Sequence, residues 1–293
     1  MDLKKPIWQW IWLLSLAFIW GSSFILIKKG LNSYSPEQVA AYRMLFAAIL
    51  LAPIALKNIK KVNKKNFIYL LEVAFIGNAI PSYLFAIGQT EISSSLAGIF
   101  NSITPIATLI IGLLLFKTKT GFFNIIGLIL GLVGAVGLIL SSNAGVDGNL
   151  YSSIVVVTAG IMYAFNLNVI KNLLSDIGGV ALTAIAFLMT LPVALGYLSI
   201  VGFAPTHGLE VANMSLLYIF LLASFSSAIA VVGFNVLIKH TSAIFASSVT
   251  YIIPIFAIMW GLLDGETVLW IQIIWLVIVI LGITLVNKKN SPN

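Results

Sequence analysis

Three pairs of neutral polar side chains occur at matching places in two similar halves of this sequence, inside long apolar runs. A polar group in the middle of a membrane span is costly unless it has a partner, so such residues tend to face a bundle interior or a wet cavity. As a set they could bind a small polar molecule by hydrogen bonding. The alternative is that each ties two helices together. The pairs are Ser23 with Asn166, Asn78 with Ser227, and Asn101 with Thr250.

Two prolines and three aromatic residues accompany these pairs. Pro105 and Pro254 each remove a backbone donor from a helix, which frees carbonyls one turn earlier, near residues 101 and 250. We expect kinks there that line a wet cavity or only shape the bundle. The aromatic residues closest to the polar pairs are the candidates for stacking on an organic molecule: Trp20, Tyr163 and Tyr251.

Two charged residues lie well inside the apolar runs, away from their ends. Arg43 could bind a carboxylate or serve a structural pairing, and Glu72 could relay a proton or lie near the membrane interface. The chain has no cysteine, and its two histidines lie far apart in the sequence, so we expect neither a metal site nor a cofactor. No nucleophile constellation or phosphate-binding motif occurs, so we do not expect an enzyme.

The composition predicts an all-α membrane protein. Hydrophobic residues make up 60% of the chain and charged residues 9%, against about 25% charged in soluble domains. A helix needs about 20 apolar residues to cross the hydrocarbon core, and ten runs meet this need without leaving room for a soluble domain. They are about 8–28, 36–56, 67–89, 92–116, 120–142, 150–174, 178–202, 214–239, 243–263 and 267–287.

The positive charge predicts the orientation in the lipid bilayer. Although the net charge is +7, its placement argues against a nucleic-acid partner. With the N-terminus in the cytoplasm, thirteen lysines fall inside and two outside, which is a strong positive-inside bias. An even number of spans then puts both termini in the cytoplasm.

One segment occurs twice. Ser93–Leu115 and Ser242–Asp264 begin 149 positions apart and align without a gap, with eight of 23 positions identical and proline on proline. We interpret this as duplication, although chance similarity of apolar helices is the alternative. Five spans per half is an odd number, so the second half would be inverted, as in many transporters. The halves are 1–145 and 146–293, divided at the loop 143–149.

These residues resemble the drug/metabolite transporter superfamily, specifically its EamA-type ten-helix permeases. The resemblance covers nearly the full chain and departs from the family where Lys117 replaces a common acidic residue, while Glu266 keeps it in the second half. It is carried by Trp20–Phe24, Arg43, Leu96–Pro105, Ala246–Pro254 and Gly265–Glu266.

The resemblance implies two inverted five-helix repeats around a central cavity and a transporter of small metabolites in the cell membrane. We therefore expect an exporter of amino acids or related polar organics that works by alternating access. An uptake permease and a non-transporting scaffold or sensor are the alternatives. A proton or another cation could couple transport, and the sequence does not predict the oligomeric state.

Overall fold

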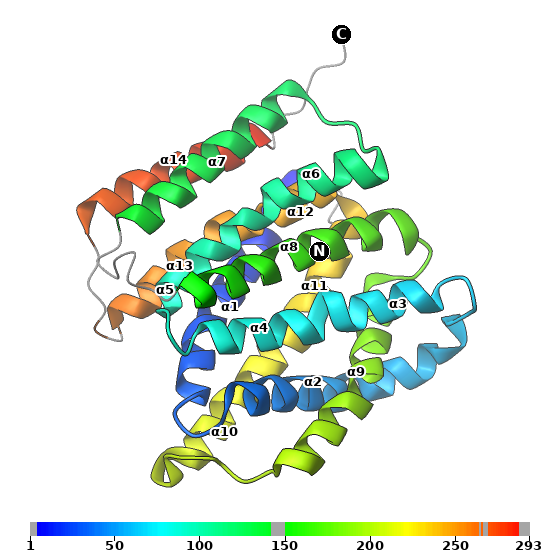
Figure 1. Ribbon diagram of the computed structural model, residues 1–293. Coiled ribbons are helices and arrows are strands. Elements are labelled where there is room, and N and C mark those ends of the chain that lie inside the picture. Colours follow the sequence, from blue (N-terminus) through cyan, green and yellow to red (C-terminus); the bar gives the residue numbers. More distant parts are fainter. Residues whose placement is uncertain (1–4, 142–149, 264, 266–268, 287–293) are drawn as a thin grey trace.

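The computed structural model describes residues 5–141, 150–263, 265 and 269–286, and these residues are all-helical (Figure 1). The predicted boundary loop 143–149, residue Glu266 and both chain ends lie outside the described residues. The α-helices are α1 (Pro6–Gly30), α2 (Pro36–Asn58), α3 (Phe67–Ala74), α4 (Ile80–Gly88), α5 (Ser94–Phe100), α6 (Thr104–Phe116), α7 (Phe122–Leu140), α8 (Leu150–Leu173), α9 (Gly179–Val201), α10 (Ala212–Leu221), α11 (Ala230–His240), α12 (Ala243–Ser247), α13 (Val249–Leu263) and α14 (Trp270–Val286).

Helix occurs within each of the ten predicted spans. Among the described residues, seven helical stretches are long and apolar enough to cross a membrane, and three shorter apolar helices accompany them. That all ten cross the bilayer, and in which direction, stays a prediction. The shorter helices are Phe122–Gly134, Ala243–Phe256 and Trp270–Gly282.

Helix α2 shows how local sequence sets an element's limits. Ser35 and Gln38 form a capping box, and Pro36 occupies the first turn, where a missing backbone donor costs nothing. The Gln38 amide also donates to the carbonyls of Gly202 and Ala204 at the end of α9. The start of α2 therefore satisfies backbone carbonyls in the segment that follows α9.

Four of the predicted spans are interrupted. Two contain π-helical turns, η2 (Phe75–Ala79) between α3 and α4, and η5 (Leu222–Ile229) between α10 and α11. The other two break between short and long helices, through the 3₁₀ turn η3 (Asn101–Ile103) and at Ser248. Such departures often mark functional sites because they redirect side chains and expose backbone groups.

The two prolines behave differently. Pro105 is the second residue of α6, directly after the interruption at η3, whereas Pro254 lies inside α13 and the helix is interrupted earlier, at Ser248. Side-chain hydroxyls satisfy the carbonyls one turn before each proline. Thr104 donates to the Asn101 carbonyl at 2.8 Å, and Ser102 donates to that of Thr250 at 3.1 Å.

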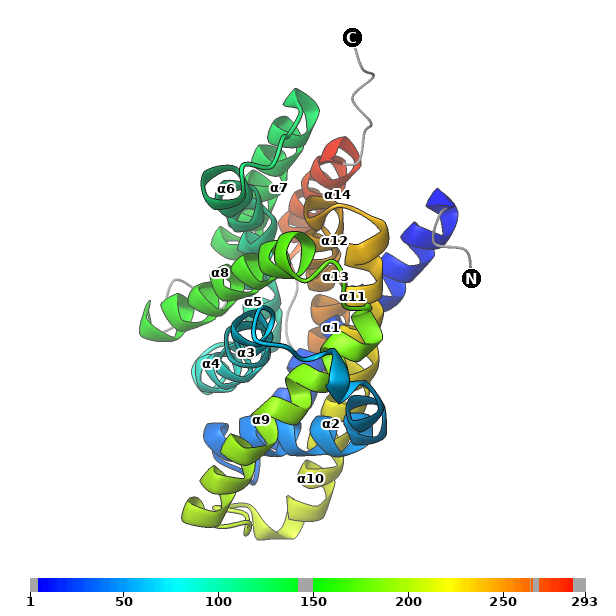
Figure 2. The ribbon, with the colours of Figure 1, turned by 90° about the vertical axis from the view of Figure 1, so that its right-hand side faces the viewer.

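Corresponding helices of the two halves have corresponding neighbours, each from the other half. Helix α1 packs on α13, as α8 packs on α6. Likewise α1 contacts α10 and α11, as α8 contacts α3 and α4. The pairs α7–α14 and α2–α9 each join one helix from either half, and they lie at opposite ends of the molecule in both ribbon views (Figures 1 and 2).

The glycines of α7 serve contact within the chain. A Cβ on Gly134 would lie 2.8 Å from the backbone nitrogen of Val279 in α14, and one on Gly137 would overlap Trp275. From the other side, a Cβ on Gly282 would lie 2.6 Å from the Gly127 carbonyl oxygen. Small residues let two helices approach closely in a membrane, so this stripe holds α7 against α14.

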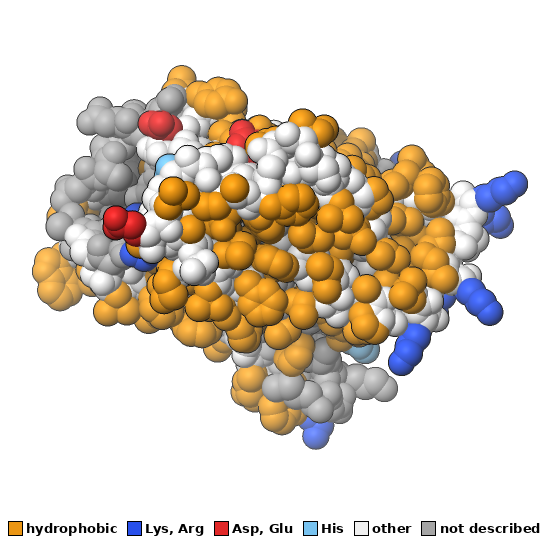
Figure 3. All heavy atoms as spheres, turned by 90° about the horizontal axis from the view of Figure 1, so that it is seen from below, with side chains coloured by type: hydrophobic (Ala, Val, Ile, Leu, Met, Phe, Trp, Pro, Cys, Tyr) orange, Lys and Arg blue, Asp and Glu red, His pale blue; other side chains and the backbone are white. Residues whose placement is uncertain are grey.

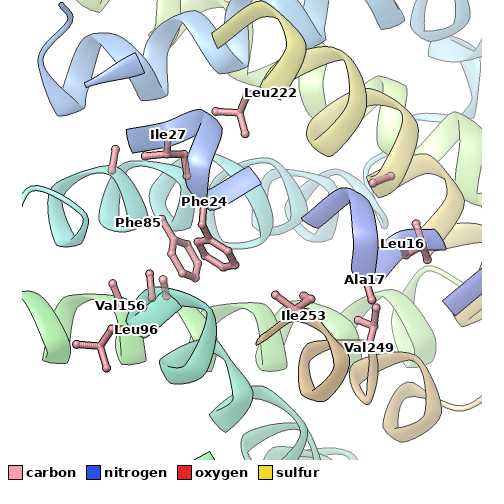
Figure 4. Close-up of a cluster of buried hydrophobic side chains, with 14 of the residues drawn as sticks. Leu16, Ala17, Phe24, Ile27, Phe85, Leu96, Val156, Leu222, Val249 and Ile253 are labelled. Atoms are coloured by element: carbon pink, nitrogen blue, oxygen red, sulfur yellow. The ribbon is translucent and has the colours of Figure 1, made fainter. Parts of the chain in front are cut away.

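The surface and the interior fit a membrane protein. In Figure 3, apolar side chains cover most of the visible face, most of the visible basic ones project from one end, and the visible acidic ones lie toward the other. Inside, a buried cluster joins helices of both halves. Figure 4 shows Phe24 of α1 and Phe85 of α4 pointing toward each other, with Ile253 of α13 nearby.

Candidate functional site

A cavity is lined by helices of both halves. About 90 Å³ of it is open to a water-sized molecule, which is room for several waters. Its walls come from α1, α2, η2, α4, η3, α6, α8, α9, η5, α11 and α13. Eight of the nine residues that the sequence suggested for binding line it: Trp20, Ser23, Asn78, Asn101, Tyr163, Asn166, Ser227 and Thr250.

The ninth, Tyr251, lies elsewhere. It is fully buried, and its ring packs so closely on Gly131 of α7 that a Cβ there would lie 2.6 Å from Tyr251 Cζ. Its hydroxyl has no hydrogen-bond partner in the described part of the chain. Successive residues of an α-helix point about 100° apart, so Thr250 can face the cavity while Tyr251 faces α7.

Arg43 also lines the cavity. Its side chain is 8% exposed, and Nε donates to the hydroxyl of Ser227 at 2.6 Å, which joins α2 to η5. Glu72 does not line the cavity. Within the described residues its two carboxylate oxygens are buried without a hydrogen-bond partner, so the structure does not join the two charges in a pair.

Several polar groups of the cavity donate to a backbone carbonyl a few residues earlier in the same span. Ser23 donates to the Trp20 carbonyl, Asn78 to that of Val73, and Thr250 to that of Ser247. Their oxygen atoms therefore retain acceptor capacity. Asn166 Oδ1 differs, since it is buried and has no donor among the described residues. An unpaired buried acceptor is costly, and a bound molecule or water could satisfy it.

Residues of the two π-helical turns form part of the cavity wall. The Asn78 amide reaches back to the Val73 carbonyl at 2.6 Å, five residues earlier, which is the spacing of a π-turn. In the other half, the indole of Trp20 donates to the Ser226 carbonyl in η5 at 3.0 Å. Both bulges thus place a polar residue, Asn78 or Ser227, on the cavity wall.

Two aromatic pairs flank the cavity at matching positions. Phe85 of α4 stacks on Tyr163 of α8 with ring centres 5.9 Å apart. Phe234 of α11 meets Trp20 of α1 edge to face at 4.8 Å. In the alignment of the halves, Phe85 corresponds to Phe234 and Tyr163 to Trp20, so each pair crosses from one half to the other. The rings offer flat apolar surfaces on which an organic molecule can stack.

Several lining residues escaped the sequence analysis. Ser82 lies one helical turn after Asn78, and Asn235 two turns after Ser227, so helical spacing could have found both. Gly77 and Phe187 carried no such signal. A Cβ on Gly77 would lie 2.4 Å from Asn166 Cγ, so this glycine lets Asn166 sit against η2.

Polar contacts close the bundle at its two ends. At the end that contains Ser33, which we call the Ser33 end, the Gln89 amide donates to the Phe24 carbonyl at 2.9 Å, and the backbone of Thr206 donates to Ser33 at 2.9 Å. At the opposite end, which we call the lysine end, Lys171 of α8 donates to carbonyls at the end of α11. Lys239 of α11 donates to the Leu174 carbonyl just after α8. Each lysine thus caps the other helix.

The chain was compared with known proteins and structures. A model of the EamA-like transporter family matches residues 7–140 and again residues 150–288. An inner membrane transporter of Escherichia coli K12 named YedA, described as uncharacterized, is 28% identical over 280 residues, with 94% of this chain and 89% of YedA covered. An uncharacterized transporter of Archaeoglobus fulgidus is 25% identical over 285 residues, with 96% and 99% covered.

The fold has a counterpart among solved structures. A crystal structure superposes with a TM-score of 0.73 over 97% of both chains, at 11% identity, and so supports the fold alone. The sequence relatives and the apolar helices both indicate a location in the membrane. The chain is a multi-pass protein of the plasma membrane, as predicted.

Proposed function

Because this chain belongs to the EamA-like transporter family, we propose that it carries small metabolites across the membrane by alternating access, and that it exports amino acids or related polar organics. The observation that carries this proposal is the cavity itself. Polar and aromatic side chains from both halves line this space, and all the polar ones among the described residues except Arg43 are neutral. Transporters bind their cargo near the bilayer midplane, between structural repeats.

We propose further that the chain forms two inverted five-helix repeats, 1–145 and 146–293, with ten spans and both termini in the cytoplasm. The family model matches each half separately. The exchange of helix neighbours, the two π-turns at matching places and the two crossed aromatic pairs support the same symmetry. The gathering of lysines at one end supports the orientation.

Alternating access needs a closure on each side of the cavity. The Ser33 end has the Gln89 contact between the end of α4 and α1, and the lysine end has the contacts between α8 and α11. These sets of contacts involve matching helices of the two halves. Release of one set while the other holds would open the cavity to a single side.

The test is transport in liposomes containing the purified protein. Uptake of labelled amino acids by exchange against the same compound inside should exceed that of empty liposomes. Asn101→Leu and Thr250→Leu each place an apolar side chain on the cavity wall. Each should lower exchange by about tenfold or more, the loss expected for about 1.4 kcal/mol of binding free energy, without lowering the melting temperature by more than a few degrees.

Two outcomes would contradict the proposal. No protein-dependent flux across a broad metabolite panel would argue for the scaffold or sensor. Full activity of both Leu variants would remove the cavity from the transport path. Direction needs a cellular measurement, in which export raises resistance to an excess of the compound and uptake instead raises growth on a limiting supply.

A further inference from the structure

Among the described residues that line the cavity, one carries a charge, and none of the others carries the opposite charge. Arg43 is buried at 8% exposure, and its Nε donates to the hydroxyl of Ser227 at 2.6 Å. Within the described part of the chain, its two terminal Nη groups make no hydrogen bond. Four N–H donors of the guanidinium are therefore available.

No acidic side chain is among the described residues that line the cavity. The described lining residues of the second half, including Phe187 of the neighbouring helix α9, are all uncharged. A cation held at membrane depth is costly and usually pairs with an anion or borders water. The site consequently lacks a counter-ion that a bound molecule could supply.

The shape of the guanidinium selects the anion. Its planar fork presents parallel N–H donors that match the two oxygens of a carboxylate. The single bond from Nε to Ser227 fixes the plane of the group and leaves the Nη side free. Because one arginine offers one such fork, the site suits a molecule with a single carboxylate.

The remainder of the wall suits the rest of such a molecule. Trp20, Phe85 and Phe234 supply rings, which can cover an apolar or aromatic body. Asn166 supplies a buried carbonyl oxygen without a donor, and this oxygen can accept a hydrogen bond from an ammonium group. An amino acid presents all three features, and a simple monocarboxylate presents two of them.

We propose that Arg43 binds the carboxylate of the transported molecule, and that the cargo consists of small monocarboxylates, amino acids among them. This inference rests on the proposed transport function and narrows its substrate class. Compounds of the same skeleton whose carboxylate is converted to an amide bind poorly, because they offer no anion to the guanidinium.

The experiment compares matched acids and amides on the purified full-length protein. The first pair is L-phenylalanine and L-phenylalaninamide, with 3-phenylpropionate and its amide as a second pair that lacks the ammonium group; a broad panel of acid–amide pairs follows. Binding is measured by thermal stabilisation in detergent, and transport by competition with exchange in liposomes. The unmodified protein should favour the acids by about 10- to 100-fold, as expected for hydrogen bonds to a charged group.

Three variants test whether Arg43 causes the preference for acids over amides. Arg43→Gln keeps hydrogen-bond donors but removes the charge, and it should abolish the preference for acids over amides. Arg43→Lys keeps the charge without the fork and should retain part of it. Lys57→Gln removes a positive charge from the exposed end of the same helix and should leave the preference unchanged.

The outcomes separate this inference from the proposed function. If Arg43→Gln still prefers acids over amides, the role of Arg43 is overturned. The same follows if the unmodified protein binds the amides as well as the acids or better, and this second test does not depend on the folding of any variant. If the protein binds acids through Arg43 but transports none of them, the carboxylate site stands and the proposed transport function is contradicted. If the protein transports only neutral compounds, the proposed transport function stands and the carboxylate site is overturned.

Discussion

Gly77 offers a sharp test of the cavity geometry, because a single methyl group added there must displace a cavity residue. In Gly77→Ala, the new Cβ would lie 2.4 Å from Asn166 Cγ, whereas carbon atoms in contact are about 3.5–4.0 Å apart. The Asn166 side chain must therefore move by about 1 Å. Asn166 Oδ1 has no hydrogen bond to hold it in place, so the amide is free to swing toward the cavity.

The size of the effect follows from this displacement. Overpacking a well-packed interior costs about 1–3 kcal/mol, and we expect the lower end of this range because the displaced group is the end of a side chain. Such a loss lowers the melting temperature by about 2–4 °C per kcal/mol. Misplacement by 1 Å within a functional site can cost on the order of 100-fold, so exchange in liposomes should fall by at least about tenfold.

Two companion variants make the result interpretable. Gly196→Ala adds the same methyl group to α9, where nothing lies within 4 Å of the new Cβ, and it should leave both melting temperature and exchange unchanged. Asn166→Ala combined with Gly77→Ala removes the overlapping atoms and should restore the melting temperature. A Gly77→Ala protein with unchanged melting temperature and unchanged exchange would refute the packing of Asn166 on Gly77 and its place in the transport path.

Three further substitutions test other parts of the structure by thermal melting. Lys171→Met removes the ammonium group that caps α11 and should cost about 0.5–1 kcal/mol, whereas the exposed Lys57→Met should cost nothing measurable. Gly282→Ala would bring its Cβ within 2.6 Å of the Gly127 carbonyl oxygen, and it should cost about 1–3 kcal/mol because backbone, rather than a side chain, must move. Trp20→Phe loses the bond to η5 while keeping a ring, so it should cost about 1 kcal/mol and also lower exchange; normal stability in all three would contradict these contacts.

Much of the cavity could be predicted from the sequence because polar residues inside apolar runs are rare and informative. The matched pairs, for example Asn78 with Ser227, come together since each lies on the inward side of its helix. The choice of aromatic residues by their nearness to the polar pairs in the sequence was less successful. Tyr251 follows Thr250 in the chain, but helix geometry turns its ring toward α7.

Other features needed the three-dimensional arrangement. The π-turn of η2 depends on which backbone groups find partners in the folded protein, and the sequence carried no signal for it. Phe187 has an ordinary apolar context in α9, so only packing shows that it reaches the cavity. The helix is likewise interrupted at Ser248 rather than at Pro254, and there the Ser248 hydroxyl donates to the Phe245 carbonyl at 2.6 Å.

The central claim is that the cavity between the two halves opens in turn to each side of the membrane. The chain has no cysteine, so Asn101→Cys introduces a single thiol on the cavity wall, and its reaction with a membrane-impermeant thiol reagent can be timed in liposomes of known protein orientation. Lys57→Cys reports the orientation, and Leu281→Cys, an exposed apolar position, reports lipid contact. We predict that Asn101→Cys reacts when the reagent is added to either side and more slowly with cargo bound; reaction from neither side, or always from the same side, would contradict the account.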